Sequence, residues 1–400
     1  ADASAIIMGN GEIEISSDRF TSGNIPIMTL SRQITTTEGE VIGAMFFHTD
    51  VSRTNDSIRK VYLDVLLSAC MLFACGKKQK DFETDTSAPA TTSEPAATDV
   101  NPLTGLTGLP ESSIGKRPVC VMVENSPEAR PQWGLCSPDI VVEGEVEGGI
   151  TRMMWMYADI SSAPKIGPTR SARHDYVELA EGFDAIYVHF GGSNLAYEKI
   201  SADKVDDIDG MKAGSYFARD KARKVAREHT AYTSGENLSK AIADKGFRTD
   251  VKSGYGSPFT FASSKRSLSG GACNSVLAVF SGNYKHTFKY NADDGLYYNN
   301  MNSDPMKDAD GNTMAVTNVI ILYTGVTGPI DASKHVDWDL KGGSGVYVSN
   351  GTYENIKWTK GDASSPLKLQ AEDGSDLQLN TGKSWIGFVR SDNAGSTVIG

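Results

Sequence analysis

Residues 1–60 alternate polar and apolar positions, most regularly between residues 39 and 48. A period of two is typical of β-strands, whose successive side chains point to opposite faces. A stretch of about sixty residues is too short to close a sizeable hydrophobic core by itself. We therefore expect strands in 1–60 without an independently stable domain.

Between residues 101 and 250, short apolar runs alternate with segments whose apolar positions lie three and four residues apart. The runs predict strands and the segments predict helices. The predicted strands are 118–123, 140–146, 152–157 and 185–190, and the predicted helices are 173–181, 194–200, 221–227 and 236–245. Ser234 stands where it can cap the last of these helices. This alternation predicts an α/β domain over 101–250.

A Ser- and Gly-rich junction at 253–271 precedes a part of the chain that has only strand-like runs. The runs are 276–280, 286–290, 319–323, 346–348, 354–358 and 385–389. Turn signals such as Asp294-Gly295 and Asn350-Gly351 separate them. The predicted fold is therefore an α/β N-terminal domain followed by a β-rich C-terminal domain over 268–400.

The segment 61–75 has the layout of a secretory signal that ends in a lipoprotein processing site. Two cations precede a short apolar core, and the small residue Ala74 stands directly before Cys75, whose thiol would carry the lipid. Residues 76–100 are a mixture of Lys, Thr, Ser, Ala, Pro and Glu, a composition that predicts a disordered tether. The alternative is an ordinary buried helix or the start of a transmembrane helix, although no apolar run reaches the roughly 18 residues of a spanning helix.

If Cys75 is lipidated, the membrane is a partner through that lipid and the remainder of the chain is extracytoplasmic. Processing before Cys75 would remove everything upstream of it. We therefore expect 1–74 to be either a processed leader or a fusion introduced by a gene model or an assembly.

Composition narrows the class of partner and cofactor. The net charge of −11 argues against nonspecific nucleic-acid binding, which needs a basic surface. The five cysteines show no paired spacing typical of zinc or of CxxC redox sites, so neither a metal nor another cofactor is expected. In an exported protein Cys120 and Cys136 can form a disulfide, but the apolar surroundings of Cys120 favour a buried thiol.

Guanidinium groups and a glycine turn are the candidates for anion binding, because both suit carboxylate or phosphate groups. The candidate residues are Arg130, Gln132, Arg152, Arg170, Ser171, Arg173, Gly191, Gly192 and Ser193. Together they predict a cleft for an anionic ligand, such as a cell-envelope polymer. The alternative is that the arginines form internal ion pairs with Glu143, Glu145 and Glu147, which alternate along one predicted strand and would share a face.

A second hypothesis is an envelope hydrolase or transferase. His189 or His229 would act as general base with Glu143 or Glu147, and Ser171 or Ser193 as nucleophile. The chain has no GxSxG or HExxH motif to support it.

The C-terminal part offers two further candidates. Its aromatic residues suit either a platform for sugar binding or, by their strand-like spacing, a β core; they are Trp338, Trp358, Trp385, Tyr347 and Tyr353. Asp304, Asp308, Asp310 and Asn312 suggest a solvated acidic loop more than a calcium loop.

Six short motifs follow one another along the chain. They are Asn-Pro-Leu-Thr-Gly at 101–105, Arg-Pro-Gln at 130–132, Glu-Gly-Gly-Ile-Thr-Arg at 147–152, Gly-Pro-Thr-Arg-Ser-Ala-Arg at 167–173, His-Phe-Gly-Gly-Ser at 189–193 and Gly-Lys-Ser-Trp-Ile at 382–386. Their order resembles the YerB-type lipoprotein family, which has no established function. The resemblance covers about three quarters of the chain, 75–400, and implies an α/β N-terminal domain and a separate C-terminal domain. It implies no catalytic residue. Residues 39–52 (GEVIGAMFFHTDVS) instead resemble the last strands of the extracellular sensor module of a membrane histidine kinase.

Overall fold

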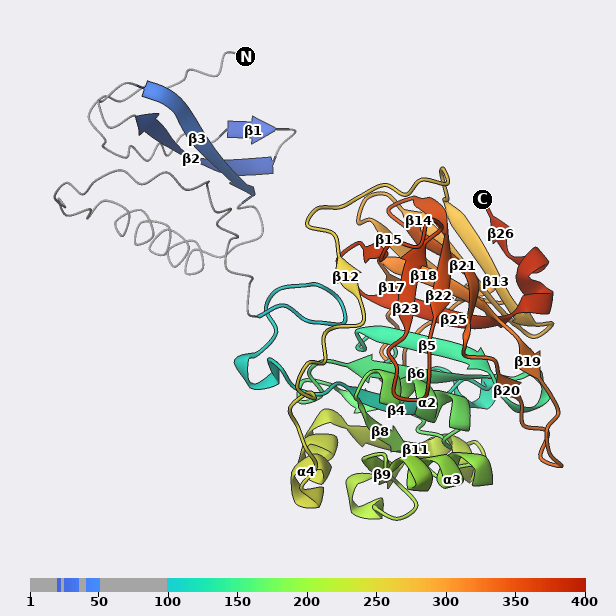
Figure 1. The fold of residues 1–400 in the computed structure, drawn as a ribbon. Coiled ribbons are helices and arrows are strands. Elements are labelled where there is room, and N and C mark those ends of the chain that lie inside the picture. Colours follow the sequence, from blue (N-terminus) through green and yellow to red (C-terminus); the bar gives the residue numbers. More distant parts are fainter. Residues whose placement is uncertain (1–19, 23–24, 36–40, 51–98) are drawn as a thin grey trace, which may run out of the picture. The chain divides into compact units, whose positions relative to one another are not determined.

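The computed structural model describes three strands between residues 20 and 50 and all of residues 99–400 (Figure 1). The chain divides between Thr92 and Ser93 into two units. In the first, β1 (Phe20–Ser22), β2 (Ile25–Thr35) and β3 (Val41–Asp50) form an antiparallel sheet, which confirms the strand predicted at 39–48. The predicted signal segment 61–75, the lipidation site Cys75 and most of the tether 76–100 lie outside the described residues. In the described part, no helix combines the length and apolar character needed to cross a membrane.

A ten-stranded sheet forms the centre of residues 99–400, in the order β23-β22-β21-β18-β25-β5-β6-β4-β8-β9. From the first half of this part come β4 (Val119–Glu124), β5 (Ile140–Glu145), β6 (Thr151–Tyr157), β8 (Ile186–His189) and β9 (Asp207–Asp209). From the second half come β18 (Asn318–Thr324), β21 (Gly342–Ser349), β22 (Thr352–Thr359), β23 (Lys368–Ala371) and β25 (Ser384–Arg390). The halves join where β5 pairs in parallel with β25, with Val142 opposite Ile386. They meet edge to edge in one sheet, so they do not stand apart as the resemblance implied.

A second sheet, of six strands, packs against the first through β13, which contacts β25, and β15, which contacts β18. It contains β13 (Ser275–Ser281), β14 (Tyr284–Asn291), β15 (Leu296–Met301), β16 (Asp304–Pro305), β17 (Ala315–Val316) and β26 (Val398–Ile399). Shorter pairings are made by β7 (Lys165–Ile166), β10 (Ala218–Arg219) and β11 (Ala231–Ser234), by β12 (Thr260–Phe261) with β24 (Gln378–Leu379), and by β19 (Val326–Thr327) with β20 (Asp337–Trp338).

Three α-helices accompany the first half: α2 (His174–Gly182), α3 (Asn194–Asp203) and α4 (Gly235–Lys245). Ser234 caps α4 by accepting a hydrogen bond from the Asn237 amide, as predicted. The α/β first half and the strand-rich second half are thus confirmed.

The helix predicted at 221–227 is wrong: residues 221–226 form a loop after β10, and Arg227 begins the 3₁₀ helix η5 (Arg227–Thr230) that precedes β11. Cations at helical spacing would repel one another there, Lys221 with Lys224 and Arg223 with Arg227. The Asp220 carboxylate instead accepts the Ala222 amide in a turn.

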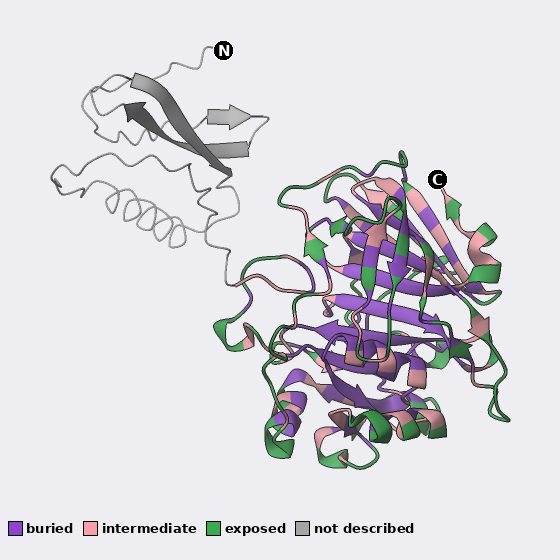
Figure 2. Ribbon diagram, viewed as in Figure 1, coloured by how far each residue is buried: buried purple, intermediate pink, exposed green. Residues whose placement is uncertain are grey.

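The middle of the central sheet is covered on both faces: β4, β5, β6 and β8 are buried at every position, and Figure 2 shows these strands in purple. Toward the other edge, β22 alternates buried and exposed positions. On β6, Met154 and Met156 belong to one apolar cluster and Met153 and Trp155 to the other, as the alternation of a strand requires. Trp338, Trp358, Trp385 and Tyr347 lie in these clusters and are buried. The β-core interpretation of these aromatic residues is therefore confirmed, and they offer no face to a sugar.

Candidate functional site

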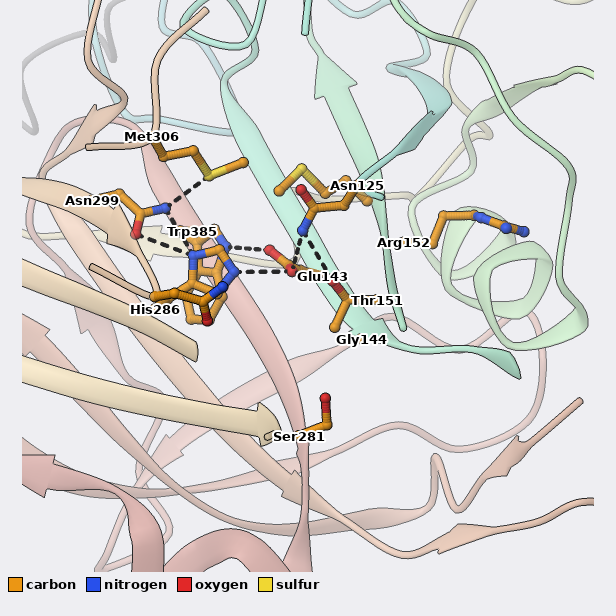
Figure 3. A network of polar contacts seen from close by, with 12 residues as sticks. Asn125, Glu143, Gly144, Thr151, Arg152, Ser281, His286, Asn299, Met306 and Trp385 are labelled. Carbon is orange, nitrogen blue, oxygen red and sulfur yellow. Dashed lines mark hydrogen bonds and ion pairs between the residues drawn. The ribbon is translucent and has the colours of Figure 1, made fainter. Parts of the chain in front are cut away.

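A buried carboxylate, Glu143 on β5, lies at the centre of a polar network between the two sheets (Figure 3). Its Oε1 accepts hydrogen bonds from Asn125 Nδ2 at 2.8 Å and Thr151 Oγ1 at 2.6 Å, and lies 3.0 Å from His286 Nε2. Its Oε2 accepts one from Trp385 Nε1 at 3.2 Å. Burial raises the pKa of Glu143, but the His286 charge and these donors outweigh burial and hold the pKa below its ordinary value.

His286 on β14 completes the network from the second half of the chain. Neither Glu143 nor His286 has any exposed side-chain surface. The other ring nitrogen of His286 faces the Asn299 amide group, which also lies within hydrogen-bond distance of Met306 Sδ. Glu143 is thus out of reach of a substrate, and the pair joins the two halves of residues 99–400.

Glu147, by contrast, leaves strand β5 and lies in the 3₁₀ turn Glu147–Gly149, so the three glutamates do not share one face. Gly148 and Gly149 have φ of 65° and 76°, which a side chain at these positions would strain. The Glu147 carboxylate receives two bonds from Arg173, at 2.6 and 2.8 Å, and one from Arg152 Nη2 at 3.1 Å. Burial raises the pKa of Glu147, but the two guanidinium groups dominate and lower it to about 2.

Thr151 and Arg152 are neighbours on β6 and point to opposite faces, Thr151 into the network and Arg152 away from it (Figure 3). Arg152 is almost fully buried, and its Nε has no hydrogen-bond partner among the described residues. Burial, followed by repulsion from Arg173, lowers the pKa of Arg152 to about 10. Glu147 and its two arginines are therefore an internal ion-pair cluster with one unused guanidinium donor.

A second ion-pair cluster surrounds Glu124 at the end of β4. The Glu124 Oε2 atom lies 2.7 Å from Arg170 Nε and 3.2 Å from His229 Nδ1. Ser126 Oγ approaches the same His229 Nδ1 at 3.5 Å, and His229 Nε2 faces Glu228. A serine–histidine–carboxylate relay needs the two partners on different ring nitrogens. Ser126 and Glu124 both approach Nδ1, so these two form no relay through His229. Ser126 and Glu228 face different ring nitrogens, but each lies 3.5 Å away, at the limit of a hydrogen bond.

The glycine turn 191–193 uses its donors internally. The Gly191 amide donates to Asp209 Oδ1 at 2.9 Å, and Ser193 Oγ caps α3 by accepting from the Ala196 amide at 3.1 Å. His189, which is fully buried, lies between the Gly191 carbonyl at 2.8 Å and Asp207 Oδ2 at 3.2 Å. The carboxylate of Asp209 thus occupies the position that was expected for a bound anion.

Comparison with known proteins places these motifs in a family. Residues 103–248 match the model described as "Protein of unknown function (DUF3048) N-terminal domain", and residues 276–386 match the corresponding C-terminal domain. The chain is 32% identical over 308 residues to "Putative lipoprotein YerB" of Bacillus subtilis (strain 168), covering 74% of this chain and 87% of that protein. The chain belongs to the YerB family. The crystal structure of the Bacillus subtilis YerB protein matches with a TM-score of 0.64 and 29% identity, over 75% of this chain and 98% of that one.

The YerB-family motifs at 147–152 and 167–173 supply Glu147, Arg152 and Arg173 of the first cluster and Arg170 of the second, whose Glu124 and His229 lie outside the motifs. Arg152 interacts electrostatically with Glu124 and Arg170 as well as with Glu147, so the clusters adjoin. Gln132 links the second cluster to the buried network, since its Nε2 donates to the Glu124 carbonyl and to Asn125 Oδ1. Internal ion pairs therefore engage three of the four candidate arginines.

Of the three glutamates expected to pair with the arginines, only Glu147 does so. The arginines pair with Glu124 and Glu147, whereas Glu143 pairs with His286 and Glu145 with Arg390. Ser171 Oγ donates to the Phe190 carbonyl at 3.4 Å and contacts no histidine in the described part of the chain.

Sequence reasoning missed a basic segment, residues 219–228, which carries five cations and two acids in a chain of net charge −11. Arg219 Nη1 donates a hydrogen bond to the Arg227 carbonyl. Burial lowers the pKa of Arg219, and the charges of Arg227 and Arg170 lower it further. Arg223 donates to the Pro131 carbonyl and lies over the Trp133 ring at 4.3 Å. Within 99–400, neither Arg130, Arg219 nor Arg227 has a carboxylate within ion-pair distance. We call Arg130, Arg170, Arg219, Arg223 and Arg227 the basic surface.

Two weaker candidates are structural. The Asp308 carboxylate accepts the amides of Asp310 and Asn312 at 3.0 and 2.9 Å and thereby organises its own turn. Cys120 is a free, buried thiol, as favoured, and Cys136 is also free. Burial, together with Asp308, raises the pKa of the Cys136 thiol to about 12, so the thiol stays protonated.

Proposed function

We propose that this member of the YerB family is an extracytoplasmic lipoprotein, held on the membrane through Cys75, that binds an anionic cell-envelope ligand at the basic surface. The observation that carries the ligand-binding part is the hydrogen bond from Arg219 to the Arg227 carbonyl, which groups two guanidinium-bearing residues beside Arg170 on a chain of net charge −11. Arginine is suited to such binding because its planar fork forms paired bonds with phosphate and carboxylate groups.

Two sequence features and one relative support the anchored location. Leu72-Phe73-Ala74-Cys75 has the small residue before cysteine that processing requires, and a polar tract follows it. The matching Bacillus subtilis protein bears the name of a lipoprotein. Each buried methylene contributes about 0.8 kcal/mol, so two acyl chains are sufficient to hold a water-soluble head on the membrane.

The neighbouring ion pairs support binding over catalysis. Glu124 holds Arg170 of the basic surface in a fixed orientation, which lowers the conformational cost of meeting a ligand. The hydrolase or transferase hypothesis gains no such support, because Ser193 caps a helix and Glu143 is sealed inside the protein.

The anchor is tested by fractionating cells that produce the wild-type chain or Cys75→Ser. We expect the wild type in the membrane fraction with a mass increase of a lipid, and the variant released as unlipidated protein. Membrane retention of an unlipidated Cys75→Ser chain would contradict the anchor.

The binding surface is tested with inorganic polyphosphate as the probe. Arg219→Gln/Arg227→Gln should weaken binding by roughly tenfold and reduce its salt dependence, because two unpaired charges are lost. The matched control is Lys240→Gln/Lys368→Gln, which removes the same charge from exposed residues elsewhere. Equal affinity of both double variants would contradict the assignment of this surface.

A further inference from the structure

Three potential metal ligands converge beside the first ion-pair cluster. His174 and Asp175 begin helix α2, and Asp337 begins strand β20. The His174 Nε2 atom lies 2.9 Å from Asp337 Oδ1 and 3.5 Å from Asp175 Oδ1. One ligand atom from each residue lies within 4.8 Å of the other two. The site therefore combines one imidazole nitrogen with two carboxylate oxygens.

An ordinary histidine–aspartate pair does not account for this arrangement. A ring nitrogen carries one hydrogen, which can serve the nearer carboxylate, Asp337, but not both. The Asp175 side chain is only 4% exposed and accepts one hydrogen bond, from the Trp338 amide at 2.9 Å. Within residues 99–400, no lysine or arginine lies within ion-pair distance of either carboxylate. A buried carboxylate beside a second one is stabilised either by a proton or by a cation placed between the two.

The spacing matches the demands of a small transition-metal ion. Zinc binds nitrogen and oxygen ligands at about 2.0–2.2 Å, so neighbouring ligand atoms in a tetrahedron lie roughly 3.3–3.5 Å apart. Of the two measured separations from His174 Nε2, the one to Asp175, 3.5 Å, falls at the upper end of this range and the one to Asp337, 2.9 Å, lies below it. An imidazole ligand favours zinc and its neighbours over calcium or magnesium, which prefer oxygen.

Both sides of the site are held by packing. Next to Asp337, the Trp338 indole donates to the Glu145 carbonyl at 2.9 Å and stacks on Phe388 at 5.3 Å. On the other side, Tyr176 of α2 meets the same indole at 4.9 Å. The side chains of His174, Asp175 and Asp337 are therefore already close to the positions needed for metal binding, which reduces the conformational entropy lost when an ion binds.

We propose that His174, Asp175 and Asp337 form a binding site for one divalent transition-metal ion, with Zn²⁺ as its representative. The ion connects α2 of the first half to β20 of the second half. Three protein ligands leave a fourth position for water or for a group of a bound ligand. This site is independent of the basic surface, so it stands or falls separately from the proposed function.

The test is titration of chelator-treated full-length protein with ZnCl₂ alone, followed by calorimetry and by the thermal transition. We expect one Zn²⁺ per chain and a raised transition temperature in the wild type. Asp337→Asn and His174→Gln should each weaken binding by at least about tenfold and abolish the thermal shift. Asp337 is mostly exposed, so its variant should fold normally, as circular dichroism of the metal-free protein will verify.

His335→Gln is the matched control. In the loop between β19 and β20, His335 Nδ1 lies 2.6 Å from Asp331 Oδ2, but among the described residues no third potential metal ligand lies close to this pair. Its loss should leave Zn²⁺ binding unchanged. The proposal is overturned by the absence of saturable binding, by equal affinity in Asp337→Asn, His174→Gln and the wild type, or by a loss confined to His335→Gln. Tighter binding of CaCl₂ or MgCl₂ than of ZnCl₂ would also overturn it.

Discussion

Replacing Glu143 with alanine should lower the free energy of unfolding of residues 99–400 by about 3–5 kcal/mol. The variant leaves His286, the Trp385 indole and the Asn125 amide buried without their shared acceptor. The desolvation penalty of these buried, unpaired polar groups is larger than the net contribution of the lost hydrogen bonds to the free energy of unfolding. Urea denaturation followed by tryptophan fluorescence measures the change, since Trp385 itself contacts Glu143.

Two control variants separate the effect of burying the Glu143–His286 pair from the effect of its charges on stability. Asp250→Ala removes an exposed ion pair of similar length, Lys116 to Asp250 at 2.6 Å, and should cost no more than about 1 kcal/mol. Glu143→Leu/His286→Leu removes both charges and should be more stable than Glu143→Ala. A cost below about 1 kcal/mol for Glu143→Ala would contradict the structural role of the network.

The network around Glu143 should also make the stability of residues 99–400 depend on pH. The folded-state pKa of Glu143 is lower than its ordinary value near 4.5, so the unfolded chain binds the proton more readily. The stabilisation is therefore complete above about pH 4.5 and is lost as the pH falls toward the folded-state pKa. The difference in stability between the wild type and Glu143→Ala should narrow over that interval.

Replacing Trp338 with alanine should cost about 3–5 kcal/mol by the same measurement. The indole is buried, stacks on Phe388, meets Tyr176 edge-on and donates to the Glu145 carbonyl. It also covers Gly144, where an added Cβ would lie 2.1 Å from the ring. The variant thus removes a hydrogen bond and leaves a large cavity above β5.

Gly144→Ala tests the same contact from the other side. In the wild type it should be destabilising by about 1–3 kcal/mol, because the anchored ring cannot move away. In the Trp338→Ala background the clash is gone, and the added methyl group should cost little. Additive costs in this double-mutant cycle would show that the indole does not lie over Gly144.

Local sequence patterns predicted the elements that depend on local order. Periodicity located β4, β5, β6 and β8, and the Ser234 cap located the start of α4, because each is specified by residues within one turn or strand. The segment 221–227 was misassigned because the pattern of apolar positions was used without the repulsion among its Lys and Arg residues. The same cluster of cations was the available signal for the basic surface.

The site itself depended on contacts between distant residues. Glu143 meets His286 and Trp385, more than 140 positions further along the chain, and no local pattern encodes such a pairing. Likewise Arg170 and Arg173, two residues of one motif, point to different glutamates, Glu124 and Glu147. The strand order of the sheet determines which carboxylate lies close enough to pair with each arginine.

The pairing of β5 with β25 has a consequence for how the protein is made. During synthesis the edge of β5 stays open until residues 384–390 have emerged, because its partner on that side is the last long strand of the chain. An unpaired strand edge of this kind invites association with other chains. The emergence of residues 384–390 is therefore the step that closes the first half, and we expect a product truncated before Ser384 to be prone to aggregation or proteolysis.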